Sequence, residues 1–216
     1  MIHRTLLALL AAVAMACPAL AQPGQPPEAA APDTFRVKFE TTAGPVVVEV
    51  KRELAPRGSD RFYQLVNEGF YDDVRIFRVV QNFVAQFGMS GDPQTNAKWQ
   101  EAKIQDDPVK TTNARGTITF ATSGKNSRTS QLFINLKDNA FLDKMGFSPF
   151  GTVVEGMENV EKFNGQYGEA PDQGAIAAQG NRYLDSRFPR LTQIKTARVI
   201  SRNGEPVQAA EKNAPQ

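Results

Sequence analysis

The amino-acid sequence predicts a mainly β fold, a closed or nearly closed antiparallel barrel capped by two or three short helices. Six to eight short segments have strand character and are separated by polar turns, whereas only a few short segments have helical spacing. Apolar and polar residues alternate within the strand segments, which argues against a parallel sheet buried on both faces. Closing the sheet into a barrel would remove its exposed edges.

The first expected elements are a hairpin and a helix. Apolar and charged residues alternate over residues 35–40, which is the period of a strand. Residues 43–45 then turn the chain into a second strand over 46–50. Pro56 opens a segment of helical periodicity, and Gly69 is placed to end that helix.

The next two strands are expected over residues 74–80 and 83–88. The long stretch 89–115 is polar and contains prolines and scattered charges, so it is predicted to be a loop excursion of the kind that often carries function. Trp99 lies within it and is expected to pin the loop to the body, because a large aromatic side chain is usually mostly buried.

The second half of the chain alternates strands and helices. Three further strands are expected over residues 116–122, 130–136 and 149–156. A helix is expected over 156–164, and another over 177–188 as a cap on the barrel; residues 193–202 form the last strand. The loop that precedes the helix over 177–188 is expected to influence substrate access to a site.

The start of the chain has the composition of a secretory signal. A basic start, an apolar run over residues 6–17 and the sequence Ala-Leu-Ala predict a signal peptide of residues 1–21, cleaved after Ala21. The expected location is therefore periplasmic or secreted. A competing interpretation makes Cys17 the lipid-bearing first residue of a bacterial lipoprotein, although the leucine usual three positions upstream is missing.

The remaining chain divides into three parts. Residues 22–33 are rich in proline and alanine and are expected to form an extended spacer. The barrel domain is expected over 34–202, and the polar residues 203–216 are expected to form a flexible tail.

Removal of residues 1–21 has a chemical consequence, because His3 and Cys17 are the only histidine and the only cysteine. The mature chain then excludes a thiol nucleophile, a Ser-His-Asp triad and a zinc site built on these residues, and no metal or cofactor is expected. The 24 basic and 23 acidic residues that remain are interspersed, so nucleic acid is not an expected partner. The apolar run of twelve residues is too short to span a bilayer, so no membrane span is expected. The protein is expected to be a monomer.

Arg78 is the residue that most needs an explanation, since it lies in an apolar strand segment. A buried charge requires a partner, so Arg78 either pairs with a carboxylate or points into a partly apolar groove where it meets a ligand. Phe83 and Gln86 follow it, and Gln131 and Phe133 lie on one face of a later strand. This combination of a guanidinium, two amides and aromatic rings favours a ligand site over a purely structural ion pair.

These residues resemble the cyclophilins, prolyl cis/trans isomerases with three ordered motifs. The matching segments are Phe77–Gly88, which lacks the usual histidine before the arginine, then Ser130–Ile134, then Phe141–Asp143. The resemblance extends from about Phe35 to Ile200. It implies an eight-stranded antiparallel barrel with two capping helices.

The resemblance also implies which residues form the site. Arg78 would be the catalytic arginine, and the substrate-binding residues would be Phe83, Val84, Gln86, Ala121, Thr122, Gln131, Phe133, Phe141, Leu142 and Phe147. Three of these depart from the common pattern. Phe141 stands where many members have tryptophan, Val84 where many have methionine, and Thr122 where many have asparagine. The missing indole N–H argues against affinity for the cyclic peptide cyclosporin.

The implied function is non-covalent acceleration of rotation about X-Pro bonds in flexible or unfolded exported proteins. In the twisted transition state the prolyl nitrogen regains a lone pair, and a donor such as Arg78 would stabilise that state. The expected partners are proline-containing peptide segments. The alternative from another class is a cyclophilin-like module or chaperone that holds proline segments with little catalysis.

Overall fold

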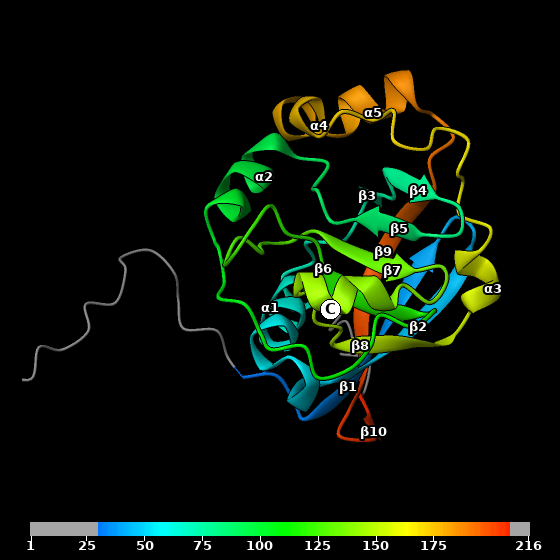
Figure 1. Cartoon of the computed structure of the whole chain (residues 1–216). Helices are drawn as coiled ribbons and strands as arrows, with labels where there is room; N and C mark the ends of the chain where they lie inside the picture. The colour runs from blue at the N-terminus through cyan, green and yellow to red at the C-terminus, as the bar shows by residue number, and fades with distance from the viewer. Residues whose placement is uncertain (1–29, 208–216) are drawn as a thin grey trace, which may run out of the picture.

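The computed structural model describes residues 30–207 of the chain (Figure 1). The predicted signal peptide, its cleavage site, Cys17 and most of the spacer lie outside the described residues, as does the end of the predicted tail. Within the described residues, no helix combines the length and apolar character that crossing a bilayer requires.

Within residues 30–207, ten strands form one antiparallel sheet in the order β10-β9-β1-β2-β8-β6-β7-β5-β4, and β3 pairs with β9. The first half of the chain supplies β1 Thr34–Thr41, β2 Gly44–Lys51, β3 Val74–Arg75, β4 Arg78–Val80 and β5 Val84–Phe87. The second half supplies β6 Thr117–Phe120, β7 Leu132–Asn135, β8 Gly151–Glu155, β9 Gln193–Arg202 and β10 Glu205–Pro206. The predicted hairpin of β1 and β2 is confirmed, with Phe39 opposite Val46.

The segment 74–80 closes the sheet into a barrel. Its first part, β3, pairs with β9, and its second part, β4, pairs with β5, so the chain connects the two edges of the sheet. The amide of Ile76 between them donates to the carbonyl of Thr192 at 2.8 Å. With β3 and β4 taken as one interrupted strand and β10 set aside, eight strands surround the core, as the resemblance implied.

Five α-helices and two short 3-10 helices are described around the barrel. They are α1 Pro56–Asn67, α2 Pro93–Gln100, α3 Met157–Val160, α4 Gln173–Gln179, α5 Asn181–Arg187, η1 Arg52–Leu54 and η2 Ala140–Met145. In Figure 1, α1 and α3 lie on opposite sides of the barrel, whereas α4 and α5 lie above β4 and β5. The predicted start of α1 at Pro56 is confirmed, and Gly69 follows its last turn.

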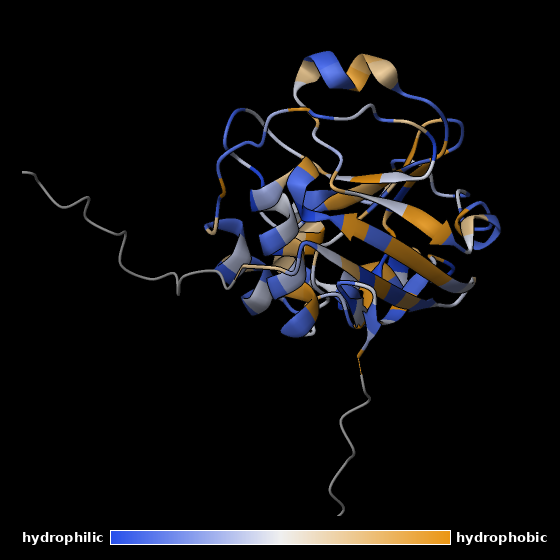
Figure 2. Ribbon diagram, turned by 90° about the horizontal axis from the view of Figure 1, so that it is seen from below, coloured by the Kyte–Doolittle hydropathy of each residue, from blue (hydrophilic) through white to orange (hydrophobic). Residues whose placement is uncertain are grey.

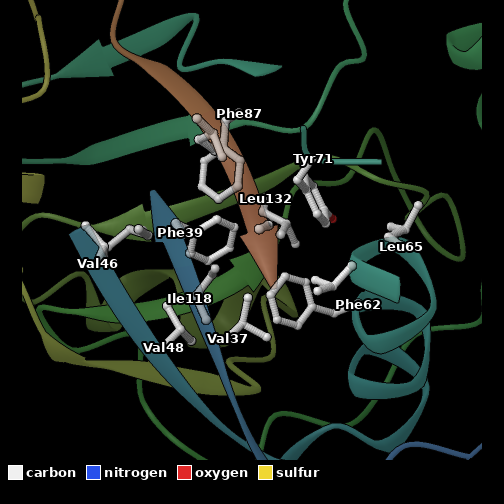
Figure 3. Close-up of a cluster of buried hydrophobic side chains, with 14 of the residues drawn as sticks. Val37, Phe39, Val46, Val48, Phe62, Leu65, Tyr71, Phe87, Ile118 and Leu132 are labelled. Atoms are coloured by element: carbon white, nitrogen blue, oxygen red, sulfur yellow. The ribbon is translucent and has the colours of Figure 1, made fainter. Parts of the chain in front are cut away.

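The main core fills the barrel. The side chains of Val37, Phe39, Val48 and Ile118 point inward from the strands, and Phe62 of α1 closes one end (Figure 3). Phe62 is fully buried and packs within 5.2 Å of the Phe150 ring, measured between centroids. Figure 2 shows that the strands carry much of the apolar sequence, while the peripheral loops are mostly polar.

The loop predicted over 89–115 contains a helix, α2, which the polar composition concealed. Asp92 accepts hydrogen bonds from the amides of Gln94 and Thr95 and so caps the start of α2. Trp99 is 4% exposed and packs against Phe70 with a centroid distance of 5.9 Å, so the prediction that it pins this segment to the body is confirmed.

The single helix predicted over 177–188 is instead two helices, α4 and α5, separated by Gly180. The periodicity continues through this position, but Gly180 has a φ of +59°, which breaks the helix. A Cβ at Gly180 would lie 1.9 Å from the carbonyl oxygen of Gly91, so only glycine allows this close approach of the two segments.

Residues at both ends of the described chain contact the barrel domain. At the first boundary, Ala31 is buried and its amide donates to Asp60 at 2.8 Å, so the end of the predicted spacer packs on the barrel domain. At the other boundary, β10, which lies within the predicted tail, pairs with β9 as a short hairpin. Asn203 and Gly204 suit the turn between them, since both adopt positive φ.

Candidate active site

The β4–β5 ladder brings the predicted arginine and its amide partner together. Arg78 lies directly opposite Gln86, and Gln86 lies opposite Phe133 of β7. The Nη1 of Arg78 donates to the Oε1 of Gln86 at 3.2 Å. Because side chains of residues paired across neighbouring strands lie on the same face of the sheet, three residues distant in sequence share one surface.

The hydrogen bonds continue from Gln86 along a chain of amides. The Nε2 of Gln86 donates to the Oε1 of Gln131 at 2.8 Å, and the Nε2 of Gln131 donates to the Oε1 of Gln173 at 3.1 Å. Gln86 and Gln131 each accept one of these hydrogen bonds and donate the next, so the chain has a defined direction. It connects Arg78 to the start of α4.

Arg78 has both of the surroundings that its sequence context suggested. Its side chain is 23% exposed and forms an ion pair with Glu169, whose Oε1 lies 2.7 Å from Nε and 2.6 Å from Nη2. The guanidinium carbon also lies 5.7 Å from the centroid of the Phe83 ring, within cation–π range. The arginine is therefore held by a carboxylate, an amide and an aromatic face at the rim of the site.

An apolar cluster, termed the apolar pocket, adjoins the guanidinium. Val84, Phe133 and Leu142 are buried together, and Phe83, Ala121 and Phe147 pack against them. The rings of Phe133 and Phe147 meet edge to face with centroids 5.5 Å apart. Phe141 stacks on Phe83 at 6.0 Å but is 54% exposed, so it forms the outer rim.

The 3-10 helix η2, which carries Phe141 and Leu142, is fixed by a polar network. The carboxylate of Asp143 accepts from the Thr112 hydroxyl and from the amide and side chain of Asn113, at 2.7–2.8 Å. Asn113 also donates to the carbonyl of Phe147 at 2.9 Å. Burial of the Asp143 carboxylate opposes its ionisation, but these hydrogen bonds outweigh it and lower its pKa.

A hollow, the polar groove, opens beside the apolar pocket with a volume of about 600 Å³. It shares Gln86, Gln131, Ala121 and Thr122 with the predicted site, and residues of α2 and α4 form much of the rest of its lining. The Thr122 hydroxyl lies 2.8 Å from that of Ser127, which fixes the turn at one wall. None of the buried residues of the apolar pocket lines this groove.

The structure therefore brings all eleven predicted site residues to one region of the barrel, around the apolar pocket and the polar groove. Sequence reasoning missed Glu169 and Gln173, which reach the site from the connection between α3 and β9. It also missed the network around Asn113 and Asp143. Within residues 30–207, no group of three or more His, Cys, Asp or Glu residues is arranged to hold a metal ion.

Residues 36–179 match the family model described as cyclophilin type peptidyl-prolyl cis-trans isomerase/CLD. The chain belongs to the cyclophilin family. Its activity is peptidyl-prolyl cis-trans isomerisation, and proline-containing peptides are its substrate class.

Two bacterial relatives illustrate the similarity. Peptidyl-prolyl cis-trans isomerase A of Dickeya dadantii is 39% identical over 144 residues, which cover 64% of this chain and 75% of the relative. Peptidyl-prolyl cis-trans isomerase B of Escherichia coli is 33% identical over 138 residues, covering 60% of this chain and 84% of the relative.

Solved structures agree on the fold of this cyclophilin. A cyclophilin type isomerase from Cryptosporidium parvum has a TM-score of 0.59 at 20% identity, covering 78% of this chain and 98% of that chain. A cyclophilin from Hirschia baltica also has a TM-score of 0.59, at 17% identity, covering 80% of this chain and 76% of that chain.

Proposed function

We propose that this cyclophilin accelerates the rotation of X-Pro bonds in exported proteins and assists their folding, with Arg78 as the donor that stabilises the twisted bond. The observation that carries the proposal is the position of the guanidinium, held by Gln86 at the edge of the apolar pocket. Rotation breaks amide resonance across a barrier of about 18–20 kcal/mol, and no covalent bond to the substrate is needed.

The apolar cluster and the polar groove would bind different parts of the peptide. The apolar pocket of Phe133, Leu142 and Phe147 suits the proline ring, because it offers carbon surface without competing donors. The polar groove suits the backbone and side chains of flanking residues, with Gln86 and Gln131 as hydrogen-bonding groups. With the ring gripped, the other side of the bond is able to turn.

The mechanism follows from the charge that develops at nitrogen. In the planar ground state the prolyl nitrogen shares its lone pair with the carbonyl, whereas in the twisted state it accepts a hydrogen bond. A donor aimed at this nitrogen binds the transition state more tightly than either planar isomer, and so lowers the barrier. A guanidinium stays protonated at ordinary pH and needs no proton transfer to act.

The proposed place of action is the periplasm or the extracellular medium. The basic start, the apolar run and the Ala-Leu-Ala sequence before Gln22 support export of the chain. The proposed clients are unfolded or flexible segments that contain proline, and the proposed working form is a monomer.

The decisive experiment compares the isomerisation rate of a proline tetrapeptide, measured by NMR exchange, for the wild type, Arg78→Ala and Arg78→Lys. Loss of one preorganised donor lowers kcat/KM by roughly 10²–10³-fold, and lysine restores little because it lacks the planar fork. Circular dichroism and thermal melting serve as controls for folding. Unchanged acceleration in Arg78→Ala would overturn the mechanism, and no acceleration by the wild type would leave only a module that holds proline segments.

A further inference from the structure

Glu169 lies in a turn that is distant in sequence from every motif of the site. The amide of Gly168 donates to the carbonyl of Gly165 at 3.1 Å, and the amide of Ala170 donates to that of Tyr167 at 2.9 Å. Gly168 has a φ of +54°, a conformation that favours glycine. This turn directs the carboxylate of Glu169 onto the Nε and Nη2 of Arg78.

The turn is anchored on both sides. Before Glu169, the Tyr167 ring packs edge to face on Phe188 with centroids 5.2 Å apart. After it, the side chain of Asp172 caps α4 by accepting from the amide of Ala175 at 2.7 Å, and the next residue, Gln173, receives the amide chain from the site. Two separate connections to the active centre therefore leave the same segment of chain.

The helices behind this turn are held by their own apolar cluster. Ile176, Leu184 and Leu191 are buried with Met89 and with Phe77, the residue directly before Arg78. The element that carries Glu169 is thus packed against the backbone that carries the arginine. The ion pair is a built-in feature of this fold, because both partners are positioned by the same buried cluster.

Pairing changes the charge that the site presents to a substrate. Arg78 borders the apolar pocket through the Phe83 ring, and without a partner its charge would attract acidic peptide residues and repel basic ones. Glu169 is 64% exposed on its side chain, so its negative charge also faces the solvent from which the peptide arrives. The pair presents nearly zero net charge, while Nη1 stays beside Gln86 at the pocket edge.

We propose that Glu169 is a specificity-determining residue of the isomerase site, which cancels the field of Arg78 so that peptides with a basic residue next to proline are accepted. Acidic residues at the same position gain no advantage. The inference rests on the proposed role of Arg78 in catalysis. It concerns which X-Pro segments the enzyme prefers and not the catalysis itself.

The test uses two tetrapeptides that differ only in having lysine or glutamate before proline, each assayed by NMR exchange with the full-length protein. The measured quantity is the ratio of kcat/KM for the lysine peptide to that for the glutamate peptide. In Glu169→Gln this ratio is expected to fall by about two- to six-fold at low salt, from the Coulomb energy of one charge at roughly 8 Å in water. At 1 M salt the difference from wild type disappears.

Glu205→Gln is the matched control, because it removes the same charge from an exposed residue of β10, at the opposite end of the molecule from β4 (Figure 1). Its ratio is expected to equal that of the wild type. An unchanged ratio in Glu169→Gln would overturn the inference, as would an equal loss of activity on both peptides, which would make Glu169 a positioning residue. If Arg78→Ala loses activity but the peptide ratio of Glu169→Gln equals that of the wild type, only this inference is refuted. If the wild type itself is inactive, the proposed function is refuted as well.

Discussion

Gln86 accepts a hydrogen bond from the Nη1 of Arg78 at 3.2 Å, from the position directly opposite it in the β4–β5 ladder. The same amide donates to Gln131 at 2.8 Å, so its oxygen is directed toward the arginine. Gln86 is buried, at 8% exposure, which keeps this arrangement from being replaced by water. The guanidinium is therefore aligned by the barrel itself, independently of Glu169.

Replacing Gln86 with leucine is expected to lower kcat/KM by about 10–100-fold, since a hydrogen bond to a charged group contributes about 1.5–3 kcal/mol. Leucine keeps most of the volume but leaves Arg78 misaligned. Gln131→Leu is the matched control, and its smaller effect is expected because Gln131 reaches the arginine only through Gln86. Equal activity of Gln86→Leu and wild type on a proline tetrapeptide would contradict the alignment role.

Removal of the Phe147 ring tests the apolar pocket. Phe147 packs on Phe133 but is only partly buried, so Phe147→Ala is expected to leave the barrel folded. Lost contact with the proline ring, about 1–2 kcal/mol, raises KM by roughly 5–30-fold, while kcat changes little because ground and transition states lose the same contact. A selective fall in kcat would show that Phe147 acts on the turning bond.

The site motifs were predictable because short-range periodicity and cross-strand pairing determine them. Gln131 and Phe133 are two positions apart on or beside β7, and the segment after Arg78 returns as β5 to bring Gln86 opposite it. Glu169 was not predictable, since its contact with Arg78 spans 91 positions and depends on the turn before α4. No local pattern distinguishes this carboxylate from the other exposed ones.

The same distinction explains the errors in the fold. Residues 74–80 have the composition of one strand, but the barrel closes only if the chain passes from β9 to β5, and this interrupts the strand at residues 76–77. Phe77 leaves the barrel core there and packs with α4 and α5. Closure and capping are properties of the whole fold, which residue alternation does not encode.

Acid is expected to destabilise η2, the 3-10 helix that carries Leu142. The pKa of Asp143 is lower in the folded state, so its ionised form stabilises the fold above the pKa of the unfolded chain, about 3.9, and this contribution is lost as pH falls through the folded value. Asp143→Asn is expected to lower the free energy of unfolding at pH 7 by about 1–2 kcal/mol through its hydrogen bonds to Thr112 and Asn113. In melting curves from pH 7 to pH 3, the difference in stability between wild type and Asp143→Asn should narrow. A difference that stays constant with pH would mean that the ionisation of Asp143 does not cause it.

Gly180 lies where α4 and α5 approach the backbone of Gly91 closely. The amide of Asn181 donates to the carbonyl of Gly91 at 2.9 Å, and a Cβ at Gly180 would clash with that carbonyl oxygen. Gly180→Ala therefore combines a positive φ with a backbone clash, and is expected to cost at least about 2 kcal/mol in the free energy of unfolding. Gly204→Ala is the control for strain alone, because Gly204 also has a positive φ, +85°, but has open space around it.

Hydrogen exchange shows which part of the fold Gly180→Ala destabilises. Faster exchange confined to residues 173–187, with β1 and β2 unchanged, is expected if α4 and α5 open as a unit on an intact barrel. Because Ile176 and Phe77 share one buried cluster, that opening also frees Glu169 from Arg78, so the variant should show the peptide preference of Glu169→Gln. Uniformly faster exchange across the barrel would mean instead that the two helices are part of a single cooperative unit, and the preference for basic or acidic peptides would then stay that of the wild type in the molecules that remain folded.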